Sequence, residues 1–374
     1  MKKVPVQEAV GMEICHDITA MRDGFKGPAF RRGHVIREED VEELLNIGKK
    51  HVFVWEENAG ELHEEDCARR MAAMAPVEGA HYTEPSEGKV LLIADRRGMF
   101  RVDTELLREI NSIGDITIST LPDHYPVEAG ARLASMRIVP LVTKEEQILR
   151  AEALCREKKL LDLKPYLPHK LGVVITGSEV YSGRIQDKFE PVIRNKMKQY
   201  DYPAEFAGVT ICDDDTDMIV QAARAHLAAG ADILLFTGGM SVDPDDITPA
   251  AIRRLGADII THGVPSQPGN MTLVAYLDRR KDAAADNTDT SHTAGAVDAA
   301  ACGTNVDNEG TGKAAILGVP GAAISLPTTI LDVLLPALFA GERITKQDLI
   351  RLGDGGLCQM CKTCHFPNCT FGRY

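Results

Sequence analysis

The chain has 374 residues, with 42 Lys and Arg against 55 Asp and Glu, so its formal net charge is −13. A surface this acidic argues against a general nucleic-acid binder, which needs a basic footprint to displace counterions. The 44% hydrophobic and 26% charged fractions exclude a wholly disordered chain, and the length predicts two or three domains.

Residues 1–60 are predicted to form a small N-terminal unit. A loop at Gly27-Pro-Ala-Phe-Arg-Arg-Gly33 precedes a short helix at Arg37–Leu45, and His51–Trp55 is predicted to be a strand. No secretory signal is expected at Met1, because residues 4–12 contain Gln7 and Glu8 and never become an apolar stretch.

Residues 61–165 are predicted to form a mixed α+β accessory region. The expected elements are a helix at Glu64–Met74 and strands at Lys89–Ala94, Asp115–Ser119 and Met136–Val142. The long polar stretch Lys144–Leu160 predicts a connector helix, which ends before Pro165 and Pro168.

Residues 166–345 are predicted to form an α/β domain, because short apolar runs alternate with amphipathic stretches of helical period. The predicted strands are Leu171–Ile175, Glu205–Ile211, Asp232–Phe236, Thr272–Leu277 and Ala314–Val319, and the predicted helices are Lys188–Met197, Thr216–Ala229 and Pro249–Leu255. This alternation predicts a three-layer fold with a mostly parallel sheet, preceded by smaller mixed β-rich units and followed by a Cys-rich tail at 346–374. Such sheets bind ligands at the carboxyl ends of their strands.

Two stretches of this domain have unusual composition. Residues 279–313 are rich in Ala, Asp, Asn, Thr and Gly, which predicts a flexible insertion in a hairpin loop. Residues 314–341 carry one charge, Asp332, but Gly318-Val-Pro-Gly321 interrupts them. A buried strand, a turn and a core helix explain this stretch better than a membrane span.

Three Gly-rich loops follow predicted strands, at Thr176–Asp187, Thr237–Thr248 and Val319–Ser325. Glycine lets the backbone approach a ligand closely, and helix N-termini offer N–H groups to a phosphate. We therefore predict an anion-binding site where these loops meet, with tight-turn geometry alone as the alternative for each loop.

Acidic residues gather at the same edge of the predicted sheet. They are Asp187, Asp213, Asp214, Asp215, Asp245 and Asp246. Carboxylates next to a phosphate-binding loop repel the ligand unless Mg²⁺ bridges the two, so at least two of them are expected to serve metal or substrate. Helix N-capping is the alternative, and one of Asp213–Asp215 is expected to cap the helix that begins near Thr216.

The pairing of TGSEV…SGxxxD with TGGxS…DDIT resembles the molybdopterin-binding fold of molybdenum cofactor biosynthesis. Ser182-Gly183…Asp187 and Asp246-Ile-Thr248 resemble its adenylyltransferase branch. Other segments resemble the molybdenum insertase (molybdopterin molybdotransferase) branch. They are Gly27–Gly33 with Ile36, Leu45-Asn-Ile-Gly48, Gln267-Pro-Gly269, and Leu317–Gly321 with Ser325.

The resemblance implies roles for residues at matching positions. Those implied to hold molybdopterin or its adenylate are Thr176, Gly177, Ser178, Ser182, Gly183, Thr237, Gly238, Gly239 and Ser241, and those implied to line the cleft are Pro268, Gly269, Pro320 and Gly321. Asp213, Asp246 and Asp187 are implied to act in catalysis, through Mg²⁺. Asn270 departs from the insertase pattern, which has Lys there, and Ala322-Ala323 replaces the usual Asn-Pro.

The tail carries a separate signal, the spacing Cys358-x2-Cys361-x2-Cys364-x4-Cys369. Thiolates at this spacing bind a single tetrahedral ion or an iron–sulfur cluster, and zinc is the first expectation because no second cysteine group exists for a ferredoxin pattern. Disulfide or redox chemistry is the alternative. Nine cysteines, an odd number, favour a reducing cytoplasm over a secreted disulfide framework.

Three functions remain open at this stage. The first is an enzyme of molybdenum cofactor maturation that performs Mg²⁺-dependent adenylyl transfer or metal insertion on molybdopterin. The second is a non-catalytic carrier or sensor of the cofactor. The third is a nucleotide pyrophosphate hydrolase, as the resemblance to the competence-damage-inducible family implies. The expected partners are a pterin and a nucleotide, with no nucleic acid and no membrane, and the resemblance implies a homodimer.

Overall fold

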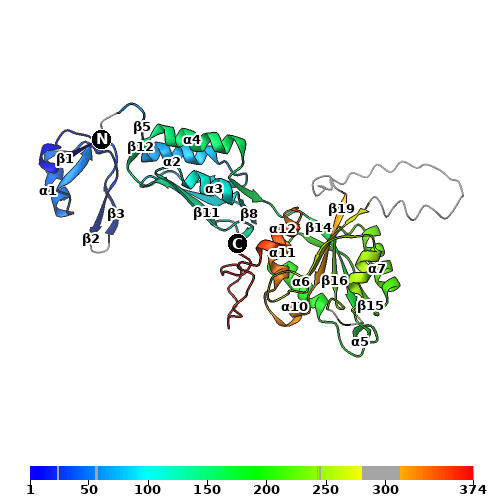
Figure 1. Ribbon diagram of the computed structural model, residues 1–374. Coiled ribbons are helices and arrows are strands. Elements are labelled where there is room, and N and C mark those ends of the chain that lie inside the picture. The colour runs from blue at the N-terminus through cyan, green and yellow to red at the C-terminus, as the bar shows by residue number, and fades with distance from the viewer. Residues whose placement is uncertain (23–24, 55–57, 242, 244–245, 280–311, 374) are drawn as a thin grey trace, which may run out of the picture. The chain divides into compact units, whose positions relative to one another are not determined.

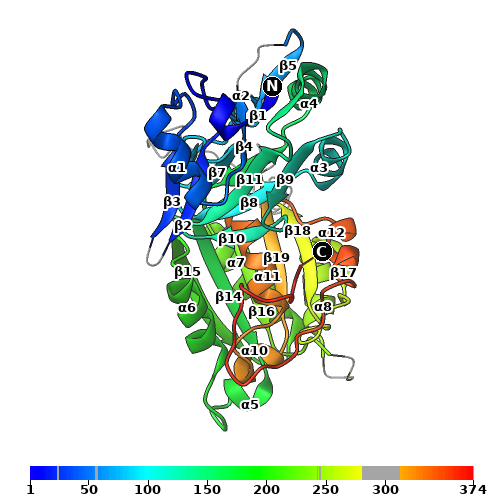
Figure 2. The same ribbon diagram turned by 90° about the vertical axis from the view of Figure 1, so that its left-hand side faces the viewer.

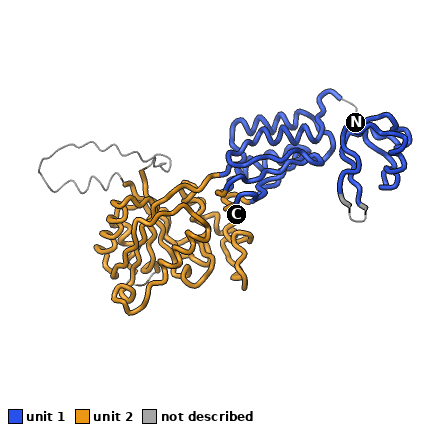
Figure 3. The backbone as a smooth tube through the Cα atoms, turned by 180° about the vertical axis from the view of Figure 1, so that it is seen from behind, with its two compact units in different colours: residues 1–96, 100–121, 128–163 blue, residues 97–99, 122–127, 164–374 orange. Residues whose placement is uncertain are grey.

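A computed structural model describes residues 1–22, 25–54, 58–241, 243, 246–279 and 312–373 of the chain. The chain folds as two compact units, coloured separately in Figure 3. Unit 1 comprises residues 1–96, 100–121 and 128–163, and unit 2 comprises residues 97–99, 122–127 and 164–374. The main division falls between residues 163 and 164, and residues 346–374 belong to unit 2.

Residues 1–54 form a small subdomain of unit 1 with its own apolar core. Its elements are β1 (Lys2–Pro5), the 3₁₀ turn η1 (Val6–Glu8), β2 (Ile18–Arg22), β3 (Phe25–Phe30), α1 (Glu38–Asn46) and β4 (His51–Val54). Strands β1 and β4 pair antiparallel, as do β2 and β3. The core side chains include Val6, Ile14, Ile36 and Leu44.

Residues 58–163 contain the other elements of unit 1. These are β5 (Glu61–His63), α2 (Glu64–Met74), β6 (Ala80–Tyr82), β7 (Lys89–Ala94), α3 (Thr104–Asn111), β9 (Ile116–Thr120), β11 (Arg132–Ile138), β12 (Val142–Lys144) and α4 (Glu145–Glu157). A four-stranded antiparallel sheet has the order β6-β7-β11-β9. Two further strands, β8 (Gly98–Val102) and β13 (Leu161–Lys164), have residues in both units, and β10 (Tyr125–Val127) belongs to unit 2.

Unit 2 is built on a six-stranded sheet with the order β15-β14-β16-β19-β18-β17. The strands are β14 (His169–Thr176), β15 (Ala204–Cys212), β16 (Ile233–Thr237), β17 (Asp258–His262), β18 (Leu273–Asp278) and β19 (Lys313–Val319). The first four strands of that order run parallel, whereas β18 and β17 run antiparallel to their neighbours. The mostly parallel sheet and the β18–β19 hairpin are therefore confirmed.

Helices cover both faces of this sheet, as Figures 1 and 2 show for this unit. The helices are α5 (Ser178–Tyr181), α6 (Phe189–Gln199), α7 (Thr216–Ala228), α8 (Thr248–Arg254), α10 (Ala322–Ser325), α11 (Ile330–Phe339) and α12 (Lys346–Arg351). Alternate strand residues enter different cores: Val173 packs with Ile193 of α6 and Leu335 of α11, whereas Val174 packs with Ile219 of α7. This alternation follows from the two-residue period of a strand, and it confirms the three-layer α/β fold.

Three details differ from the sequence-based expectations. Gly27–Phe30, expected as part of a loop, belongs to β3, where Pro28 and Gly27 pair with Thr19 and Ala20 of β2. The strand expected at Met136–Val142 is instead the end of β11 followed by the separate β12. β17 was not predicted. Among the described residues, no helix combines the length and apolarity that crossing a membrane requires. Residues 280–311, most of the predicted insertion, lie outside the described part.

Candidate functional site

The first Gly-rich loop is tied to the second by buried threonine hydroxyls at the carboxyl ends of β14 and β16. The Thr176 hydroxyl donates to the Thr237 carbonyl at 3.2 Å and lies 3.1 Å from the Thr248 hydroxyl. Thr248 in turn donates to the Gly238 carbonyl at 3.0 Å. Thr176 and Thr248 therefore join the two loops, and their hydroxyls are already engaged in the protein.

Glycine is required in the second loop for steric reasons. Gly238 has a φ of +82°, and a Cβ there would lie 2.1 Å from the Thr176 carbonyl oxygen. Gly239 has a φ of +52°, and a Cβ there would lie 2.8 Å from the Thr248 hydroxyl. A side chain at either position would force the two loops apart, so these glycines allow the loops to approach closely.

The segment that precedes β18, Gln267–Met271, lies next to the start of α11 and forms a further part of the same region. Gly269 has a φ of +111°, and a Cβ there would lie 2.5 Å from the Ile330 side chain of α11. The Pro268 carbonyl accepts the N–H of Ile330 at 3.2 Å, and the Gly269 carbonyl accepts the Thr272 hydroxyl at 2.9 Å. These bonds fix this segment against the start of α11.

The second loop, the segment before β18 and the loop after β19 line an open cleft with a volume of about 410 Å³. Its described lining residues are Phe189, Gly238, Gly239, Met240, Ser241, Asp246, Gln267, Pro268, Gly269, Asn270, Met271, Val319, Pro320, Gly321 and Ala322. A volume of this size is sufficient for a nucleotide-sized or pterin-sized ligand. The cleft lies at the carboxyl ends of β16 and β19, which is where an open parallel sheet binds ligands.

One charged side chain, Asp246, lies among the described lining residues of this cleft. Its Oδ2 accepts the N–H of Asp243 at 3.1 Å, and its Oδ1 accepts no hydrogen bond from a described residue. The remaining polar groups are neutral and come from Ser241, Gln267 and Asn270. An anionic ligand would therefore need backbone N–H groups or a bound cation, since the described lining offers no cationic side chain.

The other predicted carboxylates are engaged in holding backbone. Asp187 accepts the N–H groups of Phe189 at 2.9 Å and Glu190 at 2.8 Å, and so caps α6. Asp215 accepts the N–H of Met218 at 2.9 Å, which confirms that one of the three consecutive acids caps α7. These contacts are structural, and neither residue lines the cleft.

Of the remaining three acids, Asp213 and Asp214 follow β15, and Asp245 lies outside the described residues. Asp213 Oδ1 accepts the N–H of Asp214 at 2.9 Å, and Asp214 Oδ2 accepts the N–H of Ser178 at 2.9 Å. Asp214 therefore fixes the start of α5 in the first loop.

Cys212, which ends β15, is buried. Burial raises the pKa of its thiol, and the nearby Asp215 carboxylate raises this pKa further.

The cleft thus brings together part of the predicted site. The predicted residues that line it are Gly238, Gly239, Ser241, Asp246, Pro268, Gly269, Pro320 and Gly321. The predicted residues that do not line it are Thr176, Gly177, Ser178, Ser182, Gly183, Asp187, Asp213 and Thr237. Thr237 is fully buried, and its hydroxyl has no hydrogen-bond partner among the described residues.

Sequence reasoning did not predict several lining residues. They are Phe189, Met240, Gln267, Met271 and Val319. Gln267 directly precedes the predicted Pro268, and Phe189 follows two positions after Asp187, so proximity to a predicted residue was the available signal. The other three are apolar, which indicates core packing. Met240 and Val319 lie in the predicted loops and are 5% and 1% exposed, so only the fold shows that they form part of the cleft wall.

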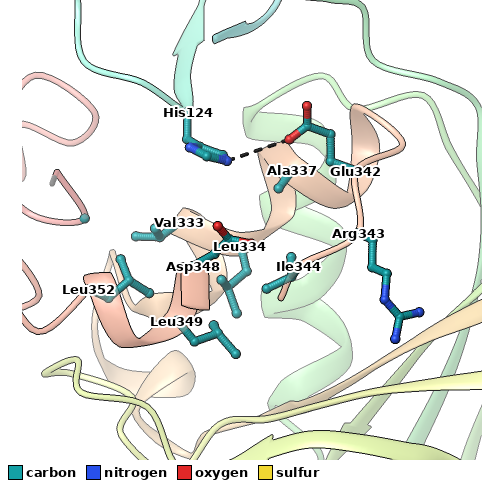
Figure 4. A pocket seen from close by; sticks show the side chains of 11 residues that line it. His124, Val333, Leu334, Ala337, Glu342, Arg343, Ile344, Asp348, Leu349 and Leu352 are labelled. Atoms are coloured by element: carbon teal, nitrogen blue, oxygen red, sulfur yellow. Dashed lines mark ion pairs between the residues drawn. The ribbon is translucent and has the colours of Figure 1, made fainter. Parts of the chain in front are cut away.

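A second cavity lies beneath α11 and α12 of unit 2, and Figure 4 shows its lining. Its volume is about 30 Å³, enough for about one or two water molecules. His124 and Glu342 form an ion pair at its edge, with Nε2 and Oε2 3.7 Å apart. It is too small to bind a cofactor.

The four tail cysteines do not form the predicted tetrahedral site in this structure. No group of three or more His, Cys, Asp or Glu side chains in the described part of the chain is arranged to hold a metal ion. Cys361, Cys364 and Cys369 are exposed and Cys358 is half-buried, and all four are free thiols.

The fold and the cleft together define an α/β domain with a cleft between glycine-containing loops at the carboxyl edge of its sheet. Residues 172–340 match the family model described as a probable molybdopterin binding domain. This part of the chain is therefore similar to the molybdopterin-binding family. Residues 3–56 match a separate model, described as a domain of unknown function.

Curated relatives and solved structures match parts of the chain. A CinA-like protein of Mycobacterium sp. (strain MCS) is 28% identical over 194 residues, covering 49% of this chain and 46% of the relative. A CinA-like protein of Mycobacterium tuberculosis (strain ATCC 25618 / H37Rv) is 34% identical over 85 residues, covering 23% of this chain and 19% of the relative. The chain thus spans about half the length of these relatives or less.

Among solved structures, the tungsten cofactor synthesizing protein MoaB from Pyrococcus furiosus is 17% identical with a TM-score of 0.32, covering 46% of this chain and 93% of that chain. The protein CinA from Thermoplasma acidophilum is 25% identical with a TM-score of 0.22, covering 25% of this chain and 53% of that chain.

Proposed function

We propose that the cleft binds molybdopterin or its adenylate, and that the chain catalyses Mg²⁺-dependent adenylyl transfer on this pterin. The observation that carries the proposal is the 410 Å³ cleft in a domain similar to the molybdopterin-binding family, lined by three glycine-containing loops and one carboxylate.

The neutral lining suits a flat heterocycle that carries a phosphate. The amides of Gln267 and Asn270 and the hydroxyl of Ser241 can each donate or accept hydrogen bonds at the edge of a pterin ring. Phe189 and Met271 supply apolar surface for its faces. The glycines of the second loop leave backbone N–H groups accessible to phosphate oxygens.

Asp246 fits the role of a Mg²⁺ ligand, because its Oδ1 accepts no hydrogen bond from a described residue and its carboxylate lies at the cleft. Mg²⁺ is commonly held by one or two carboxylates together with substrate phosphates and water. When bound, it would neutralise phosphate charge that the described lining cannot neutralise with a cationic side chain.

Adenylyl transfer is favoured over metal insertion by two lining residues. Asn270 and Ala322 stand where the insertase pattern has a cation and a polar group, so the described cleft has no side-chain cation to hold a metal oxyanion. In the proposed reaction, a pterin phosphate oxygen attacks the α-phosphorus of ATP and pyrophosphate leaves with the bonding electron pair. The protein contributes mainly by positioning, as is general for phosphoryl-type transfer.

The test incubates the full chain with molybdopterin, ATP and MgCl₂ and measures adenylated pterin by chromatography after oxidation to a fluorescent derivative. We expect product with the native chain, loss of product with Asp246→Asn, and full activity with Asp258→Asn, a matched change on the edge strand β17. Absence of product with the native chain contradicts catalysis, and tight pterin binding without turnover would favour the carrier or sensor function instead.

A nucleotide pyrophosphate hydrolase is the second candidate, favoured by the similarity to CinA-like proteins over 194 residues. Hydrolysis of an ADP-sugar in the absence of any pterin would identify it. A homodimer also belongs to the proposal, because the resemblance to the insertases implies one. A reducing cytoplasm belongs to it as well, because the eight cysteines of the described part are free thiols. Light scattering that shows a monomer would contradict the dimer.

A further inference from the structure

The four tail cysteines lie in a loop, Cys358–Cys369, that we call the thiol loop. Both of its ends are fixed to unit 2. At its start, the Cys358 N–H donates to the Gln267 carbonyl at 2.8 Å, and the Gln267 N–H donates to the Gly356 carbonyl at 2.8 Å. At its end, Phe371 is 2% exposed, and the Gly372 N–H donates to the Gly355 carbonyl at 2.9 Å.

Between these anchors, residues 359–365 of the thiol loop are exposed, whereas Pro367 and Asn368 accept hydrogen bonds from the Tyr125 hydroxyl at 3.2 Å and 2.7 Å. Three of its four cysteines are exposed, and Met360 is 63% exposed with a φ of +49°. A loop whose ends are anchored and whose middle presents soft ligands lacks a core of its own. Metal binding is the usual source of ordering free energy for such a segment.

Two of the sulfurs already have hydrogen-bonding partners. The Met360 N–H donates to Cys358 Sγ at 3.4 Å, and the Thr328 hydroxyl lies 3.0 Å from Cys364 Sγ. Groups that donate to sulfur stabilise a thiolate and orient it as a ligand. Two of the four cysteine sulfurs are therefore hydrogen-bonded to groups that are not themselves expected metal ligands, one in the loop backbone and one in the segment before α11.

We infer that the thiol loop closes around one thiophilic divalent cation, Zn²⁺, bound by the sulfurs of Cys358, Cys361, Cys364 and Cys369. The sulfurs do not converge in the described structure, so binding requires the exposed middle of the loop to move while its ends stay in place. Each thiol gives up its proton when it binds, so uptake of one Zn²⁺ releases four protons to solvent.

The loop is also connected at two points to one wall of the cleft, Gln267–Gly269. Gln267, which pairs with Cys358, is itself a lining residue. Thr328, which contacts Cys364, lies just before α11, whose first residue, Ile330, donates its N–H to the Pro268 carbonyl. Closure of the loop would therefore reduce the motion of the Gln267–Gly269 wall, which couples metal binding to the cleft.

The test titrates Cd²⁺, a spectroscopic substitute for Zn²⁺, into the reduced full chain and records thiolate-to-metal charge-transfer absorption in the near ultraviolet. We expect saturation at about one Cd²⁺ per chain, with reversal when excess Zn²⁺ is added. The band should vanish in Cys361→Ser/Cys369→Ser, which alters exposed residues only, and persist in Cys155→Ser, a control on α4. A band that survives the double substitution, or that never forms, overturns the inference.

Hydrogen exchange of the same full chain tests the coupling. Cd²⁺ should slow exchange in residues 265–271 and 326–333 of the native chain but not of the Cys361→Ser/Cys369→Ser variant. Metal binding without such protection overturns the coupling. Neither measurement uses a pterin or ATP, so failure of this inference is distinguishable from failure of the proposed function.

Discussion

A buried ion pair holds the start of α11, and its removal should destabilise unit 2 strongly. Lys196 of α6 places its Nζ 2.6 Å and 2.8 Å from the two carboxylate oxygens of Asp332, and 3.1 Å from the Pro327 carbonyl. The two side chains are 5% and 0% exposed. Asp332 also accepts the N–H of Thr329 at 2.7 Å, so it caps its own helix.

The substitution Lys196→Met keeps most of the side-chain volume but leaves the Asp332 carboxylate buried without its cation. Removing one partner of a buried pair costs about 3–5 kcal/mol, because the remaining charge is neither solvated nor paired. At about 2–4 °C per kcal/mol for a domain of this size, Tm should fall by about 6–20 °C. The double substitution Lys196→Met/Asp332→Asn removes the charge as well, so it should recover at least half of that loss.

Differential scanning calorimetry of the full chain measures these shifts. Lys198→Met is the matched control, because Lys198 lies on the same helix but is exposed, and its Tm should correspond to a change within about 0.5 kcal/mol. The reasoning is refuted if Lys196→Met costs less than about 1 kcal/mol, or if the double variant is no more stable than the single one.

Three further predictions concern the same unit. Burial lowers the pKa of His226 from 6.5, so the unfolded chain binds the proton first and stability falls as pH drops below 6.5. His226→Gln should therefore flatten the dependence of Tm on pH, and an unchanged slope would contradict this. Gly238→Ala should lower the free energy of unfolding, measured by urea denaturation, by more than about 2 kcal/mol. Gly321→Ala should change it by no more than about 0.5 kcal/mol, because the added Cβ has no atom within 4 Å and Gly321 has a φ of −56°. Asp187→Ala should lower the free energy of unfolding by about 1–2 kcal/mol, because α6 loses its cap. The folded variant should retain adenylyl transfer, and loss of turnover in a fully folded variant would assign the carboxylate to catalysis.

Much of unit 2 could be predicted from local patterns. Continuous apolar runs locate β14 and β16 to within two residues, and the helical period locates α7 to within one. These signals are reliable because a buried parallel strand and a core-facing helix each impose a period on their own residues. The position of Gly238 and Gly239 directly after β16 also follows, since loops after parallel strands meet at one edge.

Patterns were less informative where neighbouring strands decide the structure. Pro28 and Gly27 are poor strand residues, yet both lie in β3, which a two-stranded hairpin tolerates because one edge remains free. β17 is a partly buried edge strand, with a weaker apolar pattern than the central strands. Such elements are determined by pairing with a partner, and that partner is not visible in a local window of sequence.

The candidate site shows the same division between local and tertiary information. The sequence alone determined which loops carry glycine, which residues are acidic and how the four tail thiols are spaced. Only the tertiary structure decided that Asp246 reaches the cleft while Asp187 caps a helix, because both have the same local signature of a carboxylate before a helix. It also decided that Lys196 neutralises Asp332, 136 positions away, and that Cys358 pairs with Gln267. Contacts between distant residues depend on how whole elements pack, and a single sequence records the residues but not their partners.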